Sequence, residues 1–193
     1  MDSFFLNNSL FVDEKVTIMR NEYKIYDSQG VQIGVCKEKR SIASMALSML
    51  ASKDVMPFRL ELSDARGNVI ATLTKGVTLF MSTLKMHDAR GVHISTVKQK
   101  FGLTPRFEIM GVNGNKLGEI KGDFLAWDFV IYDANGNNIG AINKKMGSLV
   151  REMFTTADKY NVFVSPDLND EVLRQTILTI ASGLDMIFKE NNK

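Results

Sequence analysis

The sequence predicts a mainly β protein in which an antiparallel barrel closes around a hydrophobic C-terminal helix. Three observations favour this fold. A strand–turn–strand phrase occurs five times, a small residue recurs in the second strand of every copy, and the final helix is apolar on most of its sides. The 193 residues are enough for one full core, so we expect a single domain spanning residues 1–193.

The repeated phrase is centred on a glycine. In chain order these glycines are Gly30, Gly67, Gly91, Gly114 and Gly136. Apolar residues stand seven and five positions before each glycine, and the position between them is mostly charged, as when Tyr23 and Ile25 flank Lys24. Alternation with period two is the pattern of a half-buried strand, so we expect each copy to open with one.

A tight turn is predicted to follow each of these strands. An aspartate stands three positions before the glycine in every copy except the fourth, which has Gly111 there. The side chain of such an aspartate accepts hydrogen bonds from its own turn, and the glycine adopts a positive φ at low cost. Together they indicate a hairpin turn.

The second strand of each copy has apolar residues at the third and sixth positions after the glycine. The fourth position is always small, and the residues there are Gly34, Ala71, Ser95, Gly118 and Gly140. Small residues that recur in strands indicate that another backbone comes close. The five hairpins therefore predict ten strands with a narrow element packed against them.

A first helix is expected from Ser41 to Asp54, inserted between the first two copies, with Ser41 as its N-cap. Ile42, Met45 and Met49 lie along one side of this helix. Two roles are open for it. It caps an end of the barrel, or its adaptable methionines contact a membrane or a partner protein.

The second expected helix runs from Asn169 to Lys193 and carries no charge between Gln175 and Leu184. A helix that is apolar on most sides is buried in protein or in lipid. A membrane span needs roughly 20 apolar residues, whereas Arg174 and Asp185 bound this stretch at ten. Burial inside a closed barrel explains the apolar surface, and closure removes the exposed strand edges.

Three stretches of the chain resemble a known group of proteins. They are the strand pairs "YKIYDSQGVQIGVCKEK" and "FVIYDANGNNIGAINKK", and "ADKYNVFVSPDLND" before the terminal helix. The sequence is similar to the LURP-one and phospholipid-scramblase group, whose fold is like the tubby C-terminal domain. The resemblance implies a twelve-stranded barrel around a central hydrophobic helix. An N-terminal strand near Leu10 to Met19 and a last strand at Tyr160 to Val164 complete the twelve.

The resemblance also implies a candidate binding site. Tubby domains hold a phosphoinositide head group with lysine and arginine, and a lysine closes each of the five copies in this chain. We expect all five at the barrel rim opposite the turns, as lipid head-group candidates: Lys37, Lys75, Lys98, Lys121 and Lys144. Several positive charges around a rim attract anionic lipid. The alternative is that these lysines only keep the strand ends soluble and unpaired.

Eukaryotic scramblases have a proposed calcium loop before the terminal helix, and the matching stretch of this chain runs from Asp158 to Asp167. Calcium sites commonly carry carboxylates at alternate positions, whereas here Lys159 and apolar residues occupy them. We therefore expect no metal ion, no cofactor and no calcium-activated scrambling.

Composition and motifs narrow the class of function. A net charge of +2 is too mild for general nucleic-acid binding. One cysteine and two histidines argue against an internal disulfide and against a Cys/His zinc site. No phosphate-binding Walker loop, G-x-S-x-G elbow or H-E-x-x-H helix is present. We expect a protein that is not an enzyme.

The leading hypothesis is a cytoplasmic protein, without a signal peptide or a transmembrane span, that associates peripherally with anionic phospholipid or phosphoinositide head groups. The alternative is a protein-interaction or structural barrel with no lipid role. An enzyme with a small ligand in the barrel mouth is disfavoured, because the expected helix fills the lumen.

Overall fold

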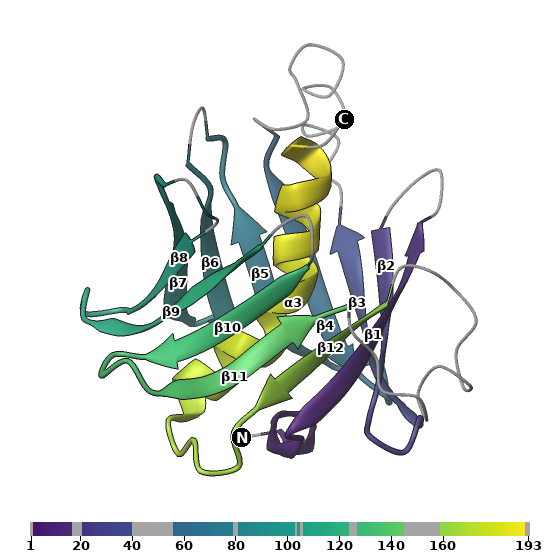
Figure 1. Cartoon of the computed structure of the whole chain (residues 1–193). Helices are drawn as coiled ribbons and strands as arrows, with labels where there is room; N and C mark the ends of the chain where they lie inside the picture. The colour runs from purple at the N-terminus through teal and green to yellow at the C-terminus, as the bar shows by residue number, and fades with distance from the viewer. Residues whose placement is uncertain are drawn as a thin grey trace.

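Twelve strands form one closed antiparallel barrel around a C-terminal helix, as the sequence predicts (Figure 1). The computed structural model describes residues 2–16, 21–39, 56–78, 81–102, 104, 106–123, 127–144 and 159–191. The expected helix from Ser41 to Asp54 lies outside the described residues and stays a prediction.

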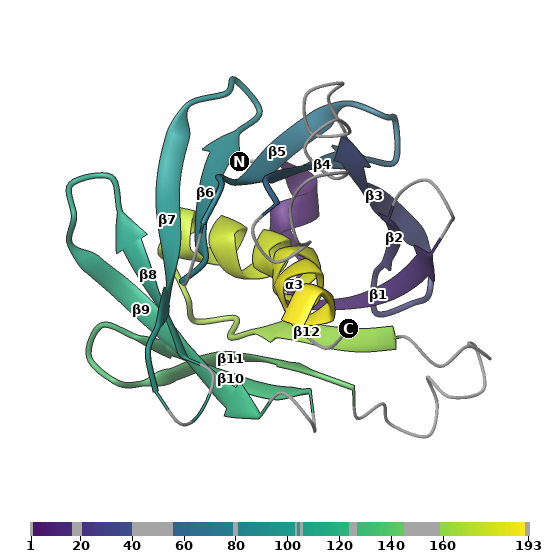
Figure 2. The same cartoon turned by 90° about the horizontal axis from the view of Figure 1, so that it is seen from above.

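The barrel follows the order of the chain. The elements are the 3-10 helix η1 (Ser3–Leu6), β1 (Ser9–Val16), β2 (Asn21–Tyr26), β3 (Gln32–Lys39), β4 (Phe58–Asp64), β5 (Val69–Lys75), β6 (Thr83–Asp88), β7 (His93–Lys100), β8 (Arg106–Gly111), β9 (Lys116–Asp123), β10 (Asp128–Asp133), β11 (Asn138–Asn143), β12 (Lys159–Val164) and α3 (Glu171–Asn191). Each strand pairs with its sequence neighbours, and β1 also pairs with β12, which closes the barrel (Figure 2).

The five hairpin turns have the predicted chemistry. Their glycines have φ between 79° and 87°, a region that side-chain-bearing residues rarely adopt. In the second turn, Oδ1 of Asp64 accepts hydrogen bonds from the backbone N–H groups of Arg66 and Asn68, at 2.9 and 2.8 Å. The fourth turn keeps the same backbone hydrogen bonds although Gly111 replaces the aspartate.

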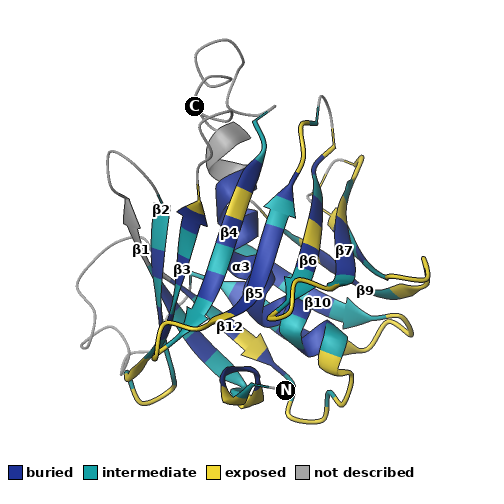
Figure 3. Ribbon diagram, turned by 180° about the vertical axis from the view of Figure 1, so that it is seen from behind, coloured by how far each residue is buried: buried dark blue, intermediate teal, exposed yellow. Residues whose placement is uncertain are grey.

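Alternate residues of each strand point into the barrel and pack against α3. Along the strands these include Tyr23, Leu60, Leu84, Phe107, Phe129 and Tyr160, all at most 1% exposed. Leu173, Ile177, Ile180 and Leu184 of α3 join them in one core. The helix is therefore enclosed by the barrel wall, and in Figure 3 most of its described length is dark blue.

At the three small fourth positions that are glycines, Gly34, Gly118 and Gly140, the closest neighbour is the adjacent strand rather than the helix. A Cβ atom on Gly140 would lie 2.5 Å from the carbonyl oxygen of Phe163 in β12. A Cβ atom on Gly118 would overlap the carbonyl oxygen of Tyr132 in β10, and would lie 3.5 Å from Leu173 of α3. The helix is thus only a second neighbour of Gly118, and none of its atoms is among the nearest neighbours of Gly140.

The helix packs tightly against the wall at Gly183, which the sequence analysis does not single out. A Cβ atom there would overlap Cδ2 of Leu73 in β5 and lie 3.3 Å from Cδ1 of Leu84 in β6. Glycine costs about 1 kcal/mol relative to alanine within a helix. Its presence in α3 is explained by the leucine side chains that press on the helix at this point.

The two charged residues that bound the apolar stretch of α3 both bind the barrel. At the start of the helix, the guanidinium of Arg174 donates to the carbonyl oxygens of Ser165 and Asn7, at 2.8 and 3.3 Å, and to Oδ1 of Asn8 at 3.0 Å. Arg174 thereby ties the start of the helix to the segment before β1 and to the segment after β12, the two strands that close the barrel.

Near the other end of the helix, the hydroxyl of Tyr23 in β2 donates to Oδ2 of Asp185 at 2.9 Å. Both residues are at most 2% exposed. Burial, with the neighbouring Asp185 carboxylate, holds the pKa of Tyr23 well above its ordinary value, so the hydroxyl remains a donor. A buried carboxylate is tolerated only when such partners offset its lost hydration.

We expect Gly118→Val and Gly140→Val each to lower the free energy of unfolding by about 1–3 kcal/mol, because the new side chain overlaps the backbone of the next strand. Urea denaturation measures the change. Lys85→Val on an exposed position of β6 is the control and should have little effect. Unchanged stability of both glycine variants would contradict the close approach.

We expect Tyr23→Phe to cost about 1–3 kcal/mol of unfolding free energy, because the buried Asp185 carboxylate loses a hydrogen-bond donor. The matched control is Tyr132→Phe, which removes a hydroxyl from a half-buried tyrosine on β10 and should change stability little. Equal stability of the Tyr23 variant and the wild type in urea would show that this hydrogen bond contributes nothing net.

Candidate functional site

The barrel has two chemically different ends. The turn rim is the end that carries the five hairpin turns after β2, β4, β6, β8 and β10, and α3 begins there. The lysine rim is the opposite end, where β3, β5, β7, β9 and β11 finish, and the helix points its C-terminal end towards it (Figure 1). All five candidate lysines lie within the last three residues of these strands or directly after one. The structure therefore brings them to one rim.

The five lysines do not share one face of the barrel wall. Lys37, Lys98 and Lys121 alternate with buried residues and point outwards. Lys75 and Lys144 stand eight rather than seven residues after their glycines. Because successive strand residues face opposite sides, this offset of one residue places them on the inward side.

Lys75 differs most from a solvated strand-end lysine, since it is only 2% exposed. Its Nζ donates to the carbonyl oxygen of Met56 at 3.3 Å and lies 5.8 Å from the ring centre of Phe58. The ammonium group of Lys75 is thus held by the protein itself and is not presented to solvent at the lysine rim.

Lys144 is half-buried beside an aromatic pair. Its Nζ lies 5.0 Å from the ring centre of Trp127, within the range of a cation–π contact. The Trp127 ring stacks on Tyr160 of β12 at 5.6 Å with an angle of 22° between the rings. Trp127 also has a φ of 48°, which is uncommon for a residue with a side chain.

The three outward lysines remain accessible. Lys37 forms an ion pair of 3.5 Å with Glu22, and its side chain is 44% exposed. Lys121 pairs with Glu119 and lies 5.1 Å from the ring centre of Tyr132. Lys98 is exposed and forms no ion pair with any residue in the described part of the chain.

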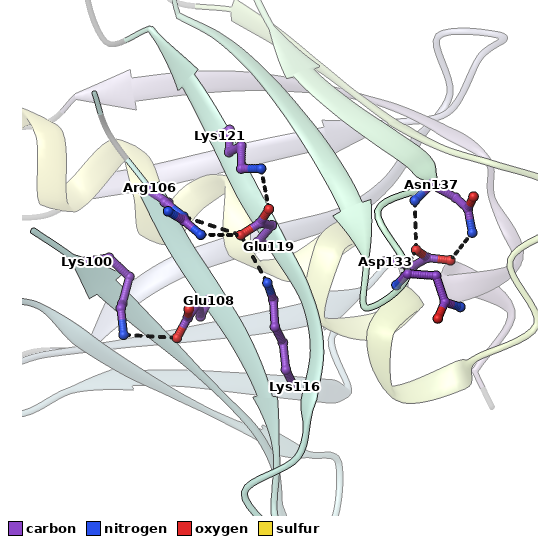
Figure 4. A network of polar contacts seen from close by, with 9 residues as sticks. Lys100, Arg106, Glu108, Lys116, Glu119, Lys121, Asp133 and Asn137 are labelled. Carbon is purple, nitrogen blue, oxygen red and sulfur yellow. Dashed lines mark hydrogen bonds and ion pairs between the residues drawn. The ribbon is translucent and has the colours of Figure 1, made fainter. Parts of the chain in front are cut away.

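Lys121 belongs to a cluster on the outer face of β8 and β9 that the sequence analysis misses. The Glu119 carboxylate binds Lys121, Arg106 and Lys116, the last two at 3.1 Å (Figure 4). These bonds, first among them the one from Lys121, lower the pKa of Glu119 to about 2. Three cations surround a single carboxylate, so the cluster is net positive.

Charge is distributed unevenly between the two rims. On the turn rim, the described residues are acidic in excess: Asp27, Asp64, Asp88, Asp133, Asp167, Asp170 and Glu171 against Arg66, Arg90 and Lys116. Hydrogen bonds within the turns lower the pKa of Asp64 and Asp133, which keeps these carboxylates ionised. The turn rim therefore repels anionic surfaces.

The described residues of the lysine rim carry nine basic and seven acidic side chains, and one of the nine, Lys75, is buried. They are Lys37, Lys39, Arg59, Lys75, Lys98, Lys100, Arg106, Lys121 and Lys144 against Glu22, Glu38, Glu61, Glu108, Glu119, Asp123 and Asp128. The excess is greatest over β7, β8 and β9, where Lys98 and Lys100 adjoin the Glu119 cluster through the strand pairing. This part of the rim is the candidate site.

The metal expectation stays a prediction. Asp158 lies outside the described residues, and Asp167 is exposed in the loop before α3. Within the described ranges, no group of three or more His, Cys, Asp and Glu side chains is placed to hold a metal ion. The rings of His87 and His93 are neighbours at 5.6 Å, but they supply only two ligands.

Comparison with known proteins identifies the group to which this barrel belongs. A family model described as Scramblase matches residues 17–191, which is most of the chain. The chain belongs to the Scramblase family. The match covers β2 to β12 and α3, and it leaves out η1 and β1.

Two yeast proteins are about one quarter identical to the chain over the residues that align. One is the Altered inheritance rate of mitochondria protein 25 of Saccharomyces cerevisiae, 25% identical over 86% of this chain and 63% of its own length. The other is a phospholipid scramblase family protein of Schizosaccharomyces pombe, 24% identical over 85% of this chain and 46% of its own length. The chain thus spans about half to two thirds of these relatives.

A solved structure supports the fold. The X-ray structure of an Arabidopsis thaliana protein superposes with a TM-score of 0.55 and 14% identity, covering 100% of this chain and 97% of the other. At that identity the likeness concerns the fold alone. Among the described residues, no helix combines the length and the apolarity needed to cross a membrane.

The lowered pKa of Glu119 predicts how stability depends on pH. A carboxylate whose pKa falls from 4.5 to about 2 on folding stabilises the protein above pH 4.5, and that contribution is lost as the pH falls towards 2. Glu119→Gln lacks the charge at every pH. We therefore expect the difference in unfolding free energy between wild type and variant to be largest near neutral pH and to shrink towards pH 2.

Urea denaturation at several pH values measures this difference. The matched control is Glu108→Gln, which removes a neighbouring carboxylate that pairs with Lys100 and is more exposed. The control should show a smaller difference at neutral pH. A difference for Glu119→Gln that does not vary with pH would rule out the ion cluster as its source.

Proposed function

We propose that this Scramblase-family barrel is a non-enzymatic protein that associates peripherally with membranes, through contacts between its lysine rim and anionic phospholipid or phosphoinositide head groups. The observation that carries the proposal is the uneven charge of the two rims. An anionic surface is attracted to the basic end over β7, β8 and β9 and repelled by the acidic turn rim. The proposal thus gives the protein a defined orientation on the lipid.

The accessible lysines set the strength of this attraction. A lysine or arginine near an anionic membrane surface contributes about 1 kcal/mol. Lys37, Lys98 and Lys121 point outwards and are accessible, whereas the ammonium of Lys75 is buried. We therefore give Lys75 a structural role at the barrel mouth. We assign the lipid contact to the three outward lysines together with Lys100 and Arg106.

The interior of the barrel is filled with side chains, so we assign the lipid contact to the outer surface. Side chains of α3 and the inward residues of the strands form one core inside the wall. A head group that meets this protein therefore encounters the rim and the outer face of the strands, where the charged side chains lie.

Replacing Lys37, Lys98 and Lys121 together by Gln should weaken binding to vesicles that contain phosphatidylserine or a phosphoinositide by about 3 kcal/mol, at about 1 kcal/mol per lysine. Co-sedimentation with vesicles over a range of salt concentrations measures the effect. Wild-type binding should fall as salt rises, because exposed charges are screened beyond about 8 Å at physiological ionic strength.

The matched control replaces Arg66 and Arg90 by Gln on the turn rim, and it should bind like the wild type. If the wild type ignores anionic vesicles at low salt, the lipid role is wrong and a protein-interaction barrel becomes the better hypothesis. If the lysine variant binds as tightly as the wild type, the lysine rim is not the contact surface.

A further inference from the structure

The corner of the lysine rim at the end of β7 exposes apolar side chains next to its basic ones. Phe101, which directly follows β7, is 91% exposed. Val77 and Met81, in the connection between β5 and β6, are 62% and 36% exposed. Large apolar side chains that are this exposed indicate an interaction surface, because leaving a phenylalanine side chain in water is unfavourable.

Hydrogen bonds hold these two connections together. The backbone N–H of Gln99 in β7 donates to the carbonyl oxygen of Ser82 at 2.9 Å, and the N–H of Ser82 donates to Oε1 of Gln99 at 3.0 Å. Met81 is therefore tied to the strand that leads to Phe101. Strands β6, β7 and β8 are neighbours around this side of the barrel (Figure 2).

Basic side chains surround the same corner. Lys98 and Lys100 lie on β7 just before Phe101, and Arg106 begins β8 opposite Lys100 in the strand pairing. The side chains of Lys100 and Arg106 are 46% and 47% exposed. A basic surface with apolar side chains protruding from it is the composition of a surface that binds the interface of an anionic bilayer.

We propose that this corner is where the protein enters the bilayer, with Phe101 inserted among the lipid chains and Lys98, Lys100 and Arg106 on the head groups. The inference rests on the proposed function and adds an apolar contact to it. Charge decides between this corner and the turn rim, which also exposes apolar residues, Val31, Val92 and Val112 among them. Asp27 and Asp88 accompany Val31 and Val92, whereas the turn of Val112 has none, and the acidic excess of the turn rim as a whole repels an anionic bilayer.

The two contributions respond differently to salt, which separates them experimentally. Screening weakens the attraction of the lysines, but it does not weaken the burial of an apolar ring. Phe101→Ser should therefore weaken binding to phosphatidylcholine vesicles containing phosphatidylserine by roughly 10- to 100-fold at every salt concentration. Its salt dependence should equal that of the wild type, and Phe101→Trp should restore binding.

An environment-sensitive fluorophore reports insertion directly. Phe101→Cys supplies an exposed thiol, whereas Cys36 is buried and burial raises its pKa to about 12, so only the new cysteine is labelled efficiently. The matched control places the label at Val31→Cys on the turn rim. On anionic vesicles, emission from position 101 should shift to the blue and emission from position 31 should stay as in water.

The outcomes distinguish the two proposals. A wild type that does not bind anionic vesicles at low salt overturns the proposed function and this inference with it. A wild type that binds with the expected salt dependence, while Phe101→Ser binds equally and the label at position 101 stays in water, overturns only the insertion. A shift at position 31 instead assigns the membrane contact to the turn rim. Melting curves should confirm that the exposed substitutions leave the fold intact.

Discussion

The structure depends on how one helix is held inside a closed sheet. The apolar side chains of α3 fill the centre of the core and the strands supply most of the rest, but an apolar helix in an apolar barrel has little to determine its depth or rotation. Arg174 and Asp185 provide that determination. One binds backbone carbonyls around the turn rim and the other accepts a hydrogen bond from Tyr23 in the wall. The leucines that press on Gly183 add a steric constraint between them.

This arrangement explains why the repeats are similar without being identical. All five turns share a glycine with positive φ, and four of them also have an aspartate cap at the equivalent position. The wall positions have to match a helix that is not itself repetitive. Ser95 shows the consequence, because its hydroxyl lies 2.7 Å from that of Thr176 on α3, whereas the equivalent Gly140 meets a neighbouring strand. The turns are determined locally and the inner faces by the helix.

The same distinction separates what the sequence predicts from what it does not. Strand alternation, turn residues and the apolar helix are local patterns, so the hairpins and α3 were predictable from them, whereas the last strand was expected from the resemblance to a known group. Lys75 is buried because it stands one residue further along its strand than the outward lysines, so that it faces inwards, and because the backbone carbonyl of Met56 accepts a hydrogen bond from it. The Glu119 cluster brings together side chains from β8 and β9 through the pairing register, and Trp127 meets Tyr160 only in the closed barrel. A single local period does not encode these contacts.

The proposed orientation on a membrane follows from the different ranges of the two forces. Electrostatic attraction to the basic rim and repulsion from the acidic rim act over about 8 Å at physiological ionic strength, before any apolar side chain touches lipid. An apolar side chain contributes binding free energy only on contact with lipid, because that contribution depends on the area removed from water. Charge therefore turns the barrel first and insertion of Phe101 follows. Because α3 runs from the turn rim towards the lysine rim, the same approach directs the C-terminal end of the helix to the bilayer side of the protein. The charge asymmetry of the rims and the exposed position of Phe101 consequently belong to one docking geometry, in which charge orients the barrel and the apolar contact adds affinity.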